Sequence, residues 1–302
     1  MTKRISNGMK KIVTAICILA ILGVAVFAFV SLWQKAQEPV VEFDEPEDHG
    51  LQLQVIGASV EGREIEAYTY GDGDIHLAFI GGIHGGYEWN SVLLAYTFID
   101  YLDANPEIVP DNLTISVIPS ANPDGLYEVV GKEGRFAMVD VPAGGSTGLG
   151  RFNAHNVDLN RNFDCNWQPE SMWRGNVVNA GSKPFSEPEA MAIRNFVLET
   201  NPDAVIFWHS QASAVYPAEC GGDILGETRD IMNAYAAAAG YRVLESFDDY
   251  EVSGSSDGWL ASIGIPALTV ELQTHETIEW ERNLAGINAL FKYYGQKKDE
   301  SQ

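Results

Sequence analysis

The sequence predicts an α/β domain preceded by one transmembrane helix. Two apolar runs typical of buried strands, at 75–80 and 113–118, flank a segment at 89–102 whose apolar residues recur at helical spacing. Strand, helix and strand in this order indicate an α/β sheet whose functional loops gather at the strand ends. An uncharged run at 12–33 is long enough to cross the hydrocarbon core of a membrane as a helix.

The basic residues around this run predict its orientation. Four precede the run and one soon follows it, namely Lys3, Arg4, Lys10, Lys11 and then Lys35. Because positive charge stays on the cytoplasmic side, residues 1–11 are expected to form a cytoplasmic tail of a single-pass membrane protein whose remaining chain lies outside. The run exceeds the usual signal-peptide apolar region and no Ala-x-Ala site ends it, so a retained anchor is favoured over a cleaved signal.

The segment at 34–49 is acidic and contains proline, which is typical of a solvated linker. The folded domain is therefore expected at 50–296. The formal net charge of the chain is -23 at pH 7. Nucleic acids are polyanions and bind to basic surfaces of proteins. The negative charge of this chain therefore excludes nucleic acid as a partner.

The other elements follow from periodicity and turn residues. Further strands are expected at 51–56, 65–70, 204–208 and 265–272, with a short one near 243. Further helices are expected from a Ser186 cap to 200, at 227–239 and at 277–294. Turn residues at 119–125 close the strand at 113–118. The stretch at 126–184 has little periodicity, and a loop of that length inside a compact domain is usually functional.

Potential metal ligands follow the strand at 75–80. His84 offers an imidazole and Glu88 a carboxylate, and the four-residue spacing puts both on one face of a helix that starts after Gly86. The alternative is an ordinary strand-to-helix turn whose histidine is hydrogen-bonded. His209 ends the buried strand at 204–208, where a hydrogen bond or a metal must satisfy its ring.

A polar, amide-rich segment inside the long stretch carries two arginines. Arg151 and Arg161 bracket it, and Arg161 with Asn160 has the donors to bind a carboxylate bidentately. A surface loop with ion-paired arginines is the alternative.

Taken together, these motifs resemble the zinc carboxypeptidases of peptidase family M14. The resemblance implies a central mixed sheet flanked by helices and one Zn²⁺ per chain, held by His84, Glu88 and His209. The spacing from His84 to Glu88 is one residue longer than the family pattern. The resemblance also implies that the Asp158 carboxylate orients the His84 ring.

The resemblance further assigns the substrate-binding and catalytic roles. Asn160 and Arg161 grip the terminal carboxylate of a peptide, and Arg151 polarises the scissile carbonyl. Tyr250 covers the bound substrate, unless it is a plain exposed aromatic residue, and Ser256 and Asp257 line the side-chain pocket. Glu271 lies in an apolar strand, where alternation alone allows it to face solvent. In the family this glutamate is the general base and acid that activates a water molecule at the zinc.

Two further patterns leave alternatives. Cys165 and Cys220 form a disulfide or remain as two free buried thiols, because spacing cannot decide between them. Residues 254–258 match the Gly-x-Ser-x-Gly nucleophile elbow. The acidic segment before them is unlike the buried strand that such an elbow requires, so chance accounts for the match.

The expected function is that of a zinc metallocarboxypeptidase acting on peptides with a free C-terminus, including cell-wall peptides. The alternatives are a zinc endopeptidase or deacylase of the same fold, and an inactive anchored binding module. Every position that the reaction needs carries a suitable residue in this sequence, which favours an enzyme over a binding module.

Overall fold

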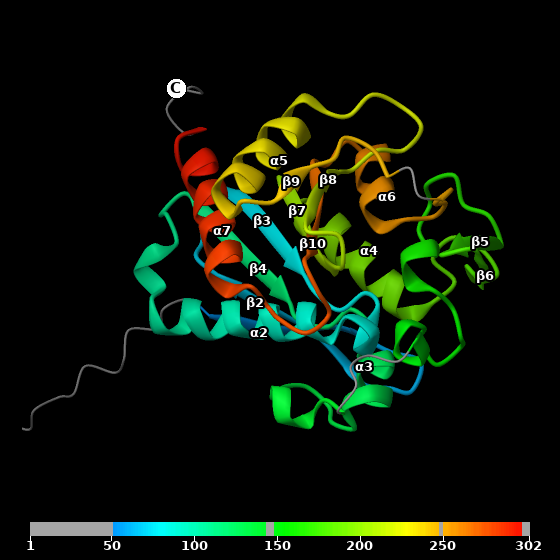
Figure 1. The fold of residues 1–302 in the computed structure, drawn as a ribbon. Coiled ribbons are helices and arrows are strands. Elements are labelled where there is room, and N and C mark those ends of the chain that lie inside the picture. The colour runs from blue at the N-terminus through cyan, green and yellow to red at the C-terminus, as the bar shows by residue number, and fades with distance from the viewer. Residues whose placement is uncertain (1–50, 143–147, 248–249, 298–302) are drawn as a thin grey trace, which may run out of the picture. The chain divides into compact units, whose positions relative to one another are not determined.

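An eight-stranded mixed sheet forms the centre of the computed structural model, which describes residues 51–142, 148–247 and 250–297 (Figure 1). The strands are β1 (Gln52–Ala58), β2 (Glu64–Tyr70), β3 (Ile75–Ile80), β4 (Leu113–Ile118), β7 (Ala204–Ser210), β8 (Ala214–Pro217), β9 (Arg242–Val243) and β10 (Ala267–Leu272). Their order across the sheet is β1-β2-β4-β3-β7-β10-β8-β9. The neighbours β4, β3, β7 and β10 are parallel, whereas β1, β2 and β8 join by antiparallel pairs. The predicted mixed sheet is confirmed.

Helices cover both faces of this sheet. They are α2 (Trp89–Ala104), α3 (Pro123–Val130), α4 (Pro188–Thr200), α5 (Gly226–Ala239), α6 (Ser256–Ser262) and α7 (Trp280–Gly295). Short 3-10 helices are η1 (Gly85–Glu88), η2 (Pro106–Ile108), η3 (Met138–Asp140), η4 (Gly148–Arg151) and η5 (Leu159–Arg161). A separate hairpin consists of β5 (Glu170–Trp173) and β6 (Asn176–Asn179). None of the helices within the described ranges has the length and apolarity to cross a membrane, and the run at 12–33 lies outside these ranges.

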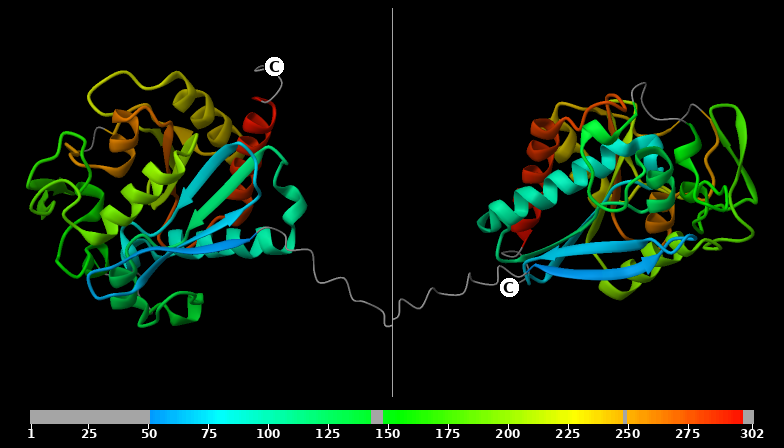
Figure 2. Two further views of the ribbon diagram at one scale, coloured as in Figure 1. Left: turned by 180° about the vertical axis from the view of Figure 1, so that it is seen from behind. Right: turned by 90° about the horizontal axis from the view of Figure 1, so that it is seen from below.

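Alternating side chains of the central strands build two cores. In β7, Ile206 and Trp208 belong to the core under α2, α5 and α7, whereas Val205 and Phe207 belong to the core under α4 and α6. A fully buried strand therefore reads as one continuous apolar run, as the sequence of β7 does. The strands β1 and β2, drawn in blue, form one edge of the sheet (Figure 2).

The four parallel strands end at the same side of the sheet. The register pairs Glu271 of β10 with His209 of β7, and it pairs Ile80 at the end of β3 with Phe207. Loops that leave these ends consequently meet above β7, which is where ligands bind in open α/β sheets.

Two local expectations were wrong. The expected turn at 119–125 contains the start of α3, because Asn122 caps the helix by accepting a hydrogen bond from the N–H of Gly125 at 2.9 Å, and Pro123 occupies the first turn. Ser186 does not cap α4. Its N-cap residue is Glu187, whose side chain makes no capping bond, while the Ser186 hydroxyl donates to the Glu187 carboxylate instead.

Candidate active site

Three side chains converge beyond the ends of the parallel strands. His84 immediately precedes η1, and Glu88 ends it. His209 is the second-to-last residue of β7. One ligand atom from each lies within 4.8 Å of the others. All three residues are at most 3% exposed. This is the cluster of potential metal ligands that the sequence predicted.

The unmet polar atoms of this cluster fit a bound cation. Nδ1 of His209 lies 3.0 Å from Oε2 of Glu88, yet that oxygen has no hydrogen-bond partner with suitable geometry. Nδ1 of His84 and Nε2 of His209 have none either. Each of the three residues thus has a buried polar atom without a hydrogen bond, and one ligand atom of each lies within 4.8 Å of the others, which fits a positive ion bound by the cluster. Two imidazoles and one carboxylate are a donor set suited to Zn²⁺ that leaves one position open.

Paired glycines allow the longer spacing between His84 and Glu88. Gly85 has a φ of 46°, and a Cβ there would lie 2.6 Å from the carbonyl oxygen of Gly150. A Cβ on Gly86 would lie 2.5 Å from the Val129 side chain. The short helix η1 therefore packs closely against its neighbours and returns Glu88 to the metal cluster.

Asp158 links the metal cluster to Arg151. Its Oδ2 accepts hydrogen bonds from Nε of Arg151 at 2.9 Å and pairs with Nη2 at 2.8 Å. Its Oδ1 lies 3.5 Å from Nδ1 of His84, without a formed hydrogen bond. The carboxylate, which is fully buried, thus fixes the arginine and faces the histidine ring.

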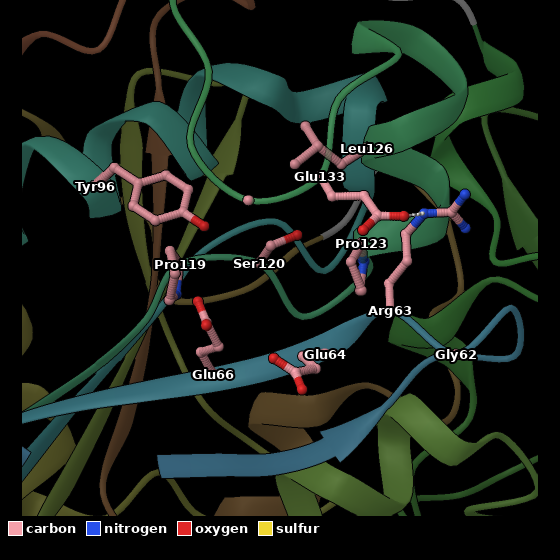
Figure 3. A pocket seen from close by; sticks show the side chains of 11 residues that line it. Gly62, Arg63, Glu64, Glu66, Tyr96, Pro119, Ser120, Pro123, Leu126 and Glu133 are labelled. Carbon is pink, nitrogen blue, oxygen red and sulfur yellow. Dashed lines mark ion pairs between the residues drawn. The ribbon is translucent and has the colours of Figure 1, made fainter. Parts of the chain in front are cut away.

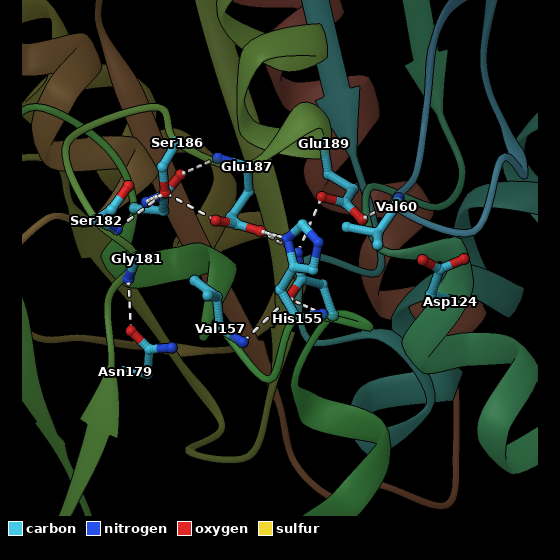
Figure 4. A network of polar contacts seen from close by, with 12 residues as sticks. Val60, Asp124, His155, Val157, Asn179, Gly181, Ser182, Ser186, Glu187 and Glu189 are labelled. Atoms are coloured by element: carbon cyan, nitrogen blue, oxygen red, sulfur yellow. Dashed lines mark hydrogen bonds and ion pairs between the residues drawn. The ribbon is translucent and has the colours of Figure 1, made fainter.

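A polar network holds the loop that carries these residues (Figure 4). The Asn153 amide donates to the carboxylates of Glu187 at 2.8 Å and Glu189 at 3.1 Å, and its oxygen accepts from the N–H of Val157. Glu189 also accepts from the N–H of Val60 at 3.1 Å. The loop is therefore fastened to the start of α4 and to the turn between β1 and β2, which keeps its arginines in place.

A cavity of about 800 Å³ opens onto the cluster, and we call it the metal pocket. Arg161 lines it and is 3% exposed. Its Nη1 and Nη2 donate to the carbonyl oxygens of Asn160 at 2.7 Å and Met172 at 3.2 Å, and its Nε has no partner. In the described part of the chain, no carboxylate forms an ion pair with Arg161. Burial lowers the pKa of Arg161, but a guanidinium stays charged.

Ser256 orients the side-chain amide of Asn160. Its Oδ1 accepts hydrogen bonds from the N–H and the hydroxyl of Ser256, both at 2.9 Å. The Nδ2 donor of Asn160, a residue that lines the pocket, is thereby available to a ligand. Ser256 itself is 1% exposed and does not line the pocket, contrary to what the family resemblance implied.

Asp257 and Tyr250 do line the metal pocket. The Asp257 carboxylate accepts from Thr269 at 3.1 Å and from the N–H of Gly258 at 2.8 Å. The Tyr250 ring packs against Phe247 at 4.8 Å between centroids, and burial raises its pKa.

Glu271 reaches the pocket beside His209, its partner in the strand register. Its Oε2 is buried and has no hydrogen-bond partner. Burial, followed by the neighbouring Glu88 carboxylate, raises the pKa of Glu271 to about 7. A carboxyl group with such a pKa can take up and release a proton near neutral pH.

The two histidines respond differently to this environment. Burial, together with Arg151, lowers the pKa of His84 well below its ordinary value. Burial also disfavours the charged form of His209, but the Glu88 and Glu271 carboxylates outweigh it and raise the pKa. His84 is therefore neutral and ready to bind a metal, whereas a proton competes for His209.

Aromatic side chains form a wall beside the cluster that no local sequence pattern predicts. The Tyr87 ring lies 4.6 Å from that of His275 and 5.2 Å from that of Trp173, and the Arg151 guanidinium lies 4.6 Å from Trp173. Trp173 and the exposed Arg174, at the turn of the β5–β6 hairpin, come from the aperiodic stretch at 126–184. Only the tertiary fold brings that hairpin to the pocket.

Cys165 and Cys220 form a disulfide in the structure, with 5.7 Å between their Cα atoms. Both line the metal pocket. Of the two alternatives left by the sequence, the structure therefore shows the bridge, which ties the loop after Arg161 to the loop after β8.

Comparisons with known proteins agree with this geometry. The chain is 26% identical over 245 residues to gamma-D-glutamyl-L-diamino acid endopeptidase 1 of Lysinibacillus sphaericus, covering 74% of this chain but only 60% of that protein. It is 27% identical over 241 residues to carboxypeptidase B of Astacus astacus, covering 72% of this chain and 78% of the relative. The crystal structure of thrombin activatable fibrinolysis inhibitor superposes with a TM-score of 0.67 at 19% identity, covering 82% of this chain and 70% of that one.

The family model described as zinc carboxypeptidase matches residues 42–285, which include the ligand cluster, Arg151, Arg161 and Glu271. The chain therefore belongs to the zinc carboxypeptidase family, peptidase family M14.

Proposed function

We propose that this protein is a zinc metallocarboxypeptidase, which removes the last residue of a peptide with a free C-terminus. The observation that carries the proposal is Arg161, a buried guanidinium in the metal pocket with no carboxylate partner among the described residues. A buried charge is costly unless an opposite charge joins it. A terminal carboxylate fits a guanidinium fork bidentately.

The surrounding residues supply the remaining contacts. Nδ2 of Asn160 donates a second hydrogen bond to the carboxylate, because Ser256 holds the amide oxygen away. Nε and Nη2 of Arg151 are engaged by Asp158, so Nη1, which lies 4.0 Å from Glu88, donates to the carbonyl oxygen of the scissile bond.

Glu271 moves the proton in this proposal. Zinc, when held by His84, Glu88 and His209, supplies a Lewis acid that polarises a carbonyl group and lowers the pKa of water. Glu271 accepts a proton on Oε2 from the attacking water and returns it to the nitrogen of the leaving amine. Its pKa of about 7 suits both transfers.

Cell-wall peptides are the substrate class that we propose. Support comes from the endopeptidase relative, whose name specifies a gamma-D-glutamyl-L-diamino acid bond. A domain outside the membrane, as the run at 12–33 predicts, has access to such peptides. A reporter that is active only outside the cytoplasm, fused after Val40, should give signal; no signal there would contradict the export.

A digest of a peptide library, read by mass spectrometry, tests the activity. Release of single C-terminal residues is the expected result. Cleavage mainly at internal bonds would replace the carboxypeptidase with an endopeptidase of the same fold. Absence of cleavage by protein that holds stoichiometric zinc would favour the binding module.

A further inference from the structure

A second cavity, of about 450 Å³, lies between β2 and the helices α2 and α3 (Figure 3). We call it the β2 cavity. Its lining includes Arg63, Glu64, Glu66, Tyr96, Ser120 and Glu133. None of these residues lines the metal pocket, so the β2 cavity is a separate feature of the domain.

The charges around the β2 cavity are predominantly negative. Glu64, Glu66 and Glu133 line it together with a single cation, Arg63. That guanidinium is already neutralised, since its Nη1 lies 2.7 Å from Asp124 and also pairs with Glu61, and its Nε lies 3.3 Å from Glu133. Glu64 and Glu66 have no cationic partner among the described ion pairs, so the cavity retains an excess of negative charge.

A buried hydroxyl without a partner indicates that the cavity takes a polar ligand. Ser120 is 8% exposed and its Oγ makes no hydrogen bond. Buried polar groups are nearly always hydrogen-bonded in folded proteins, so an unpaired one in a cavity wall calls for a partner. Tyr96, 4% exposed, points its hydroxyl into the same space, and burial raises its pKa, so the phenol keeps its proton (Figure 3).

The arrangement favours an organic cation over a metal ion. Among the described residues, the one group of three or more ligands close enough to hold a metal is the His84, Glu88 and His209 cluster. The carboxylates of the β2 cavity therefore do not converge on a single point. A volume of about 450 Å³ instead lies in the range of pockets for small organic molecules.

We propose that the β2 cavity binds a small organic cation that carries a primary ammonium or a guanidinium group. Glu66 and Glu64 provide its counter-charge, and Ser120 and Tyr96 accept hydrogen bonds from its N–H groups. A free amine and the basic side chain of a peptide share this chemistry. The proposal does not depend on the activity proposed for the metal pocket.

Isothermal titration of the full-length protein with agmatine and with putrescine tests the proposal. Both should bind, with one site per chain for the tighter of the two, and butane-1,4-diol, which has no charge, should not. Glu66→Gln keeps the acceptor for the Tyr68 hydroxyl, which lies 3.0 Å away, so the variant should fold. It should weaken binding about tenfold or more, because a charge-assisted hydrogen bond is lost.

Glu107→Gln is the matched control, because Glu107 is an exposed glutamate of η2 that lines neither pocket. It should leave the affinity unchanged. Equal weakening by Glu66→Gln and Glu107→Gln would reduce the binding to general attraction by an acidic protein and overturn the proposal. Failure of both amines to bind wild type would also overturn it.

Ser120→Ala distinguishes a binding role from a structural one. Because the hydroxyl has no partner in the free protein, its removal should not lower Tm, yet it should weaken amine binding severalfold. Unchanged affinity would remove Ser120 from the site. Titration with an acetylated, amidated lysine peptide then identifies the source: binding as tight as putrescine indicates a basic side chain, whereas much weaker binding indicates a free amine.

Discussion

The metal pocket and the β2 cavity leave opposite charges without partners. In the metal pocket the unpaired group is a buried cation, Arg161, beside a cluster of converging metal ligands. In the β2 cavity the excess charge is anionic, and its carboxylates surround the space without converging. Both sites lie beside the loops that follow the parallel strands, and both depend on the turn between β1 and β2.

The turn between β1 and β2 contacts the surroundings of both sites through different carboxylates. Glu189 binds the N–H of Val60 in that turn and, through Asn153, supports the arginine loop of the metal pocket. Asp124 binds the N–H of Glu61 in the same turn and pairs with Arg63 of the β2 cavity. Arg63 is neutralised by its ion pairs, whereas Arg161 forms no ion pair among the described residues. In the two proposals, the pairing of each arginine, more than its presence, determines the charge that each site attracts.

The largest expected effect is a loss of turnover at the metal pocket that leaves the β2 cavity unchanged. Glu271→Gln should lower kcat on the order of 10³-fold, because a general base contributes about 10² to 10⁴. It should retain zinc and leave amine binding in the β2 cavity unchanged. His209→Ala should lose both zinc and activity, since two ligands hold the ion poorly.

Metal analysis and amine titration of the same preparations check this prediction. Glu66→Gln is the reciprocal control, which should weaken the amine without changing zinc content. Equal zinc in wild type and His209→Ala would remove His209 from the metal site, and loss of amine binding in Glu271→Gln would show that the two sites are coupled.

Asn153→Ala tests the shared support. The substitution removes the donor that serves the buried Glu187 and Glu189 carboxylates, which should lower the free energy of unfolding by about 1–3 kcal/mol. Urea unfolding measures the change. Asn195→Ala, at an exposed position of α4, is the control and should be neutral or slightly stabilising, since alanine favours a helix. Equal stability of the two variants would contradict a supporting role for the network.

Ser256→Ala should have the smallest effect. Asn160 loses one of two hydrogen bonds to its oxygen but keeps the one from the N–H of residue 256, so kcat/KM on free-acid peptides should fall up to about tenfold with zinc unchanged. Ser262→Ala, at the other end of α6, is the control. An unchanged kcat/KM would mean that Asn160 does not need the hydrogen bond from the Ser256 hydroxyl to bind the substrate.

Much of the fold followed from the sequence because its signals are local. The bounds of β3 and β4 agree with the apolar runs at 75–80 and 113–118, and the strand ends correctly bring His84 and His209 together. In a parallel sheet these ends must share one edge, which is why positions 125 residues apart could be expected to meet.

The remainder depends on tertiary contacts that no local pattern records. Asn122 and Pro123 are as common in turns as at helix starts, so α3 was missed. Ser256 begins α6 and turns behind Asn160, a pairing across 96 positions. Trp173 reaches the metal pocket on a hairpin whose four-residue strands carry too few alternations to be detected.

The most direct test of the central claim compares matched peptides that end in a free acid or in an amide. Arg161 is expected to bind the terminal carboxylate, so wild type should prefer the acid on the order of 10²-fold or more in kcat/KM. Arg161→Ala should lose that preference by cleaving the acid as poorly as the amide. Arg174→Ala, which removes an exposed arginine from the same pocket, should keep it. If wild type cleaves the amide as well as the acid, Arg161 does not bind a C-terminal carboxylate and the protein is not a carboxypeptidase.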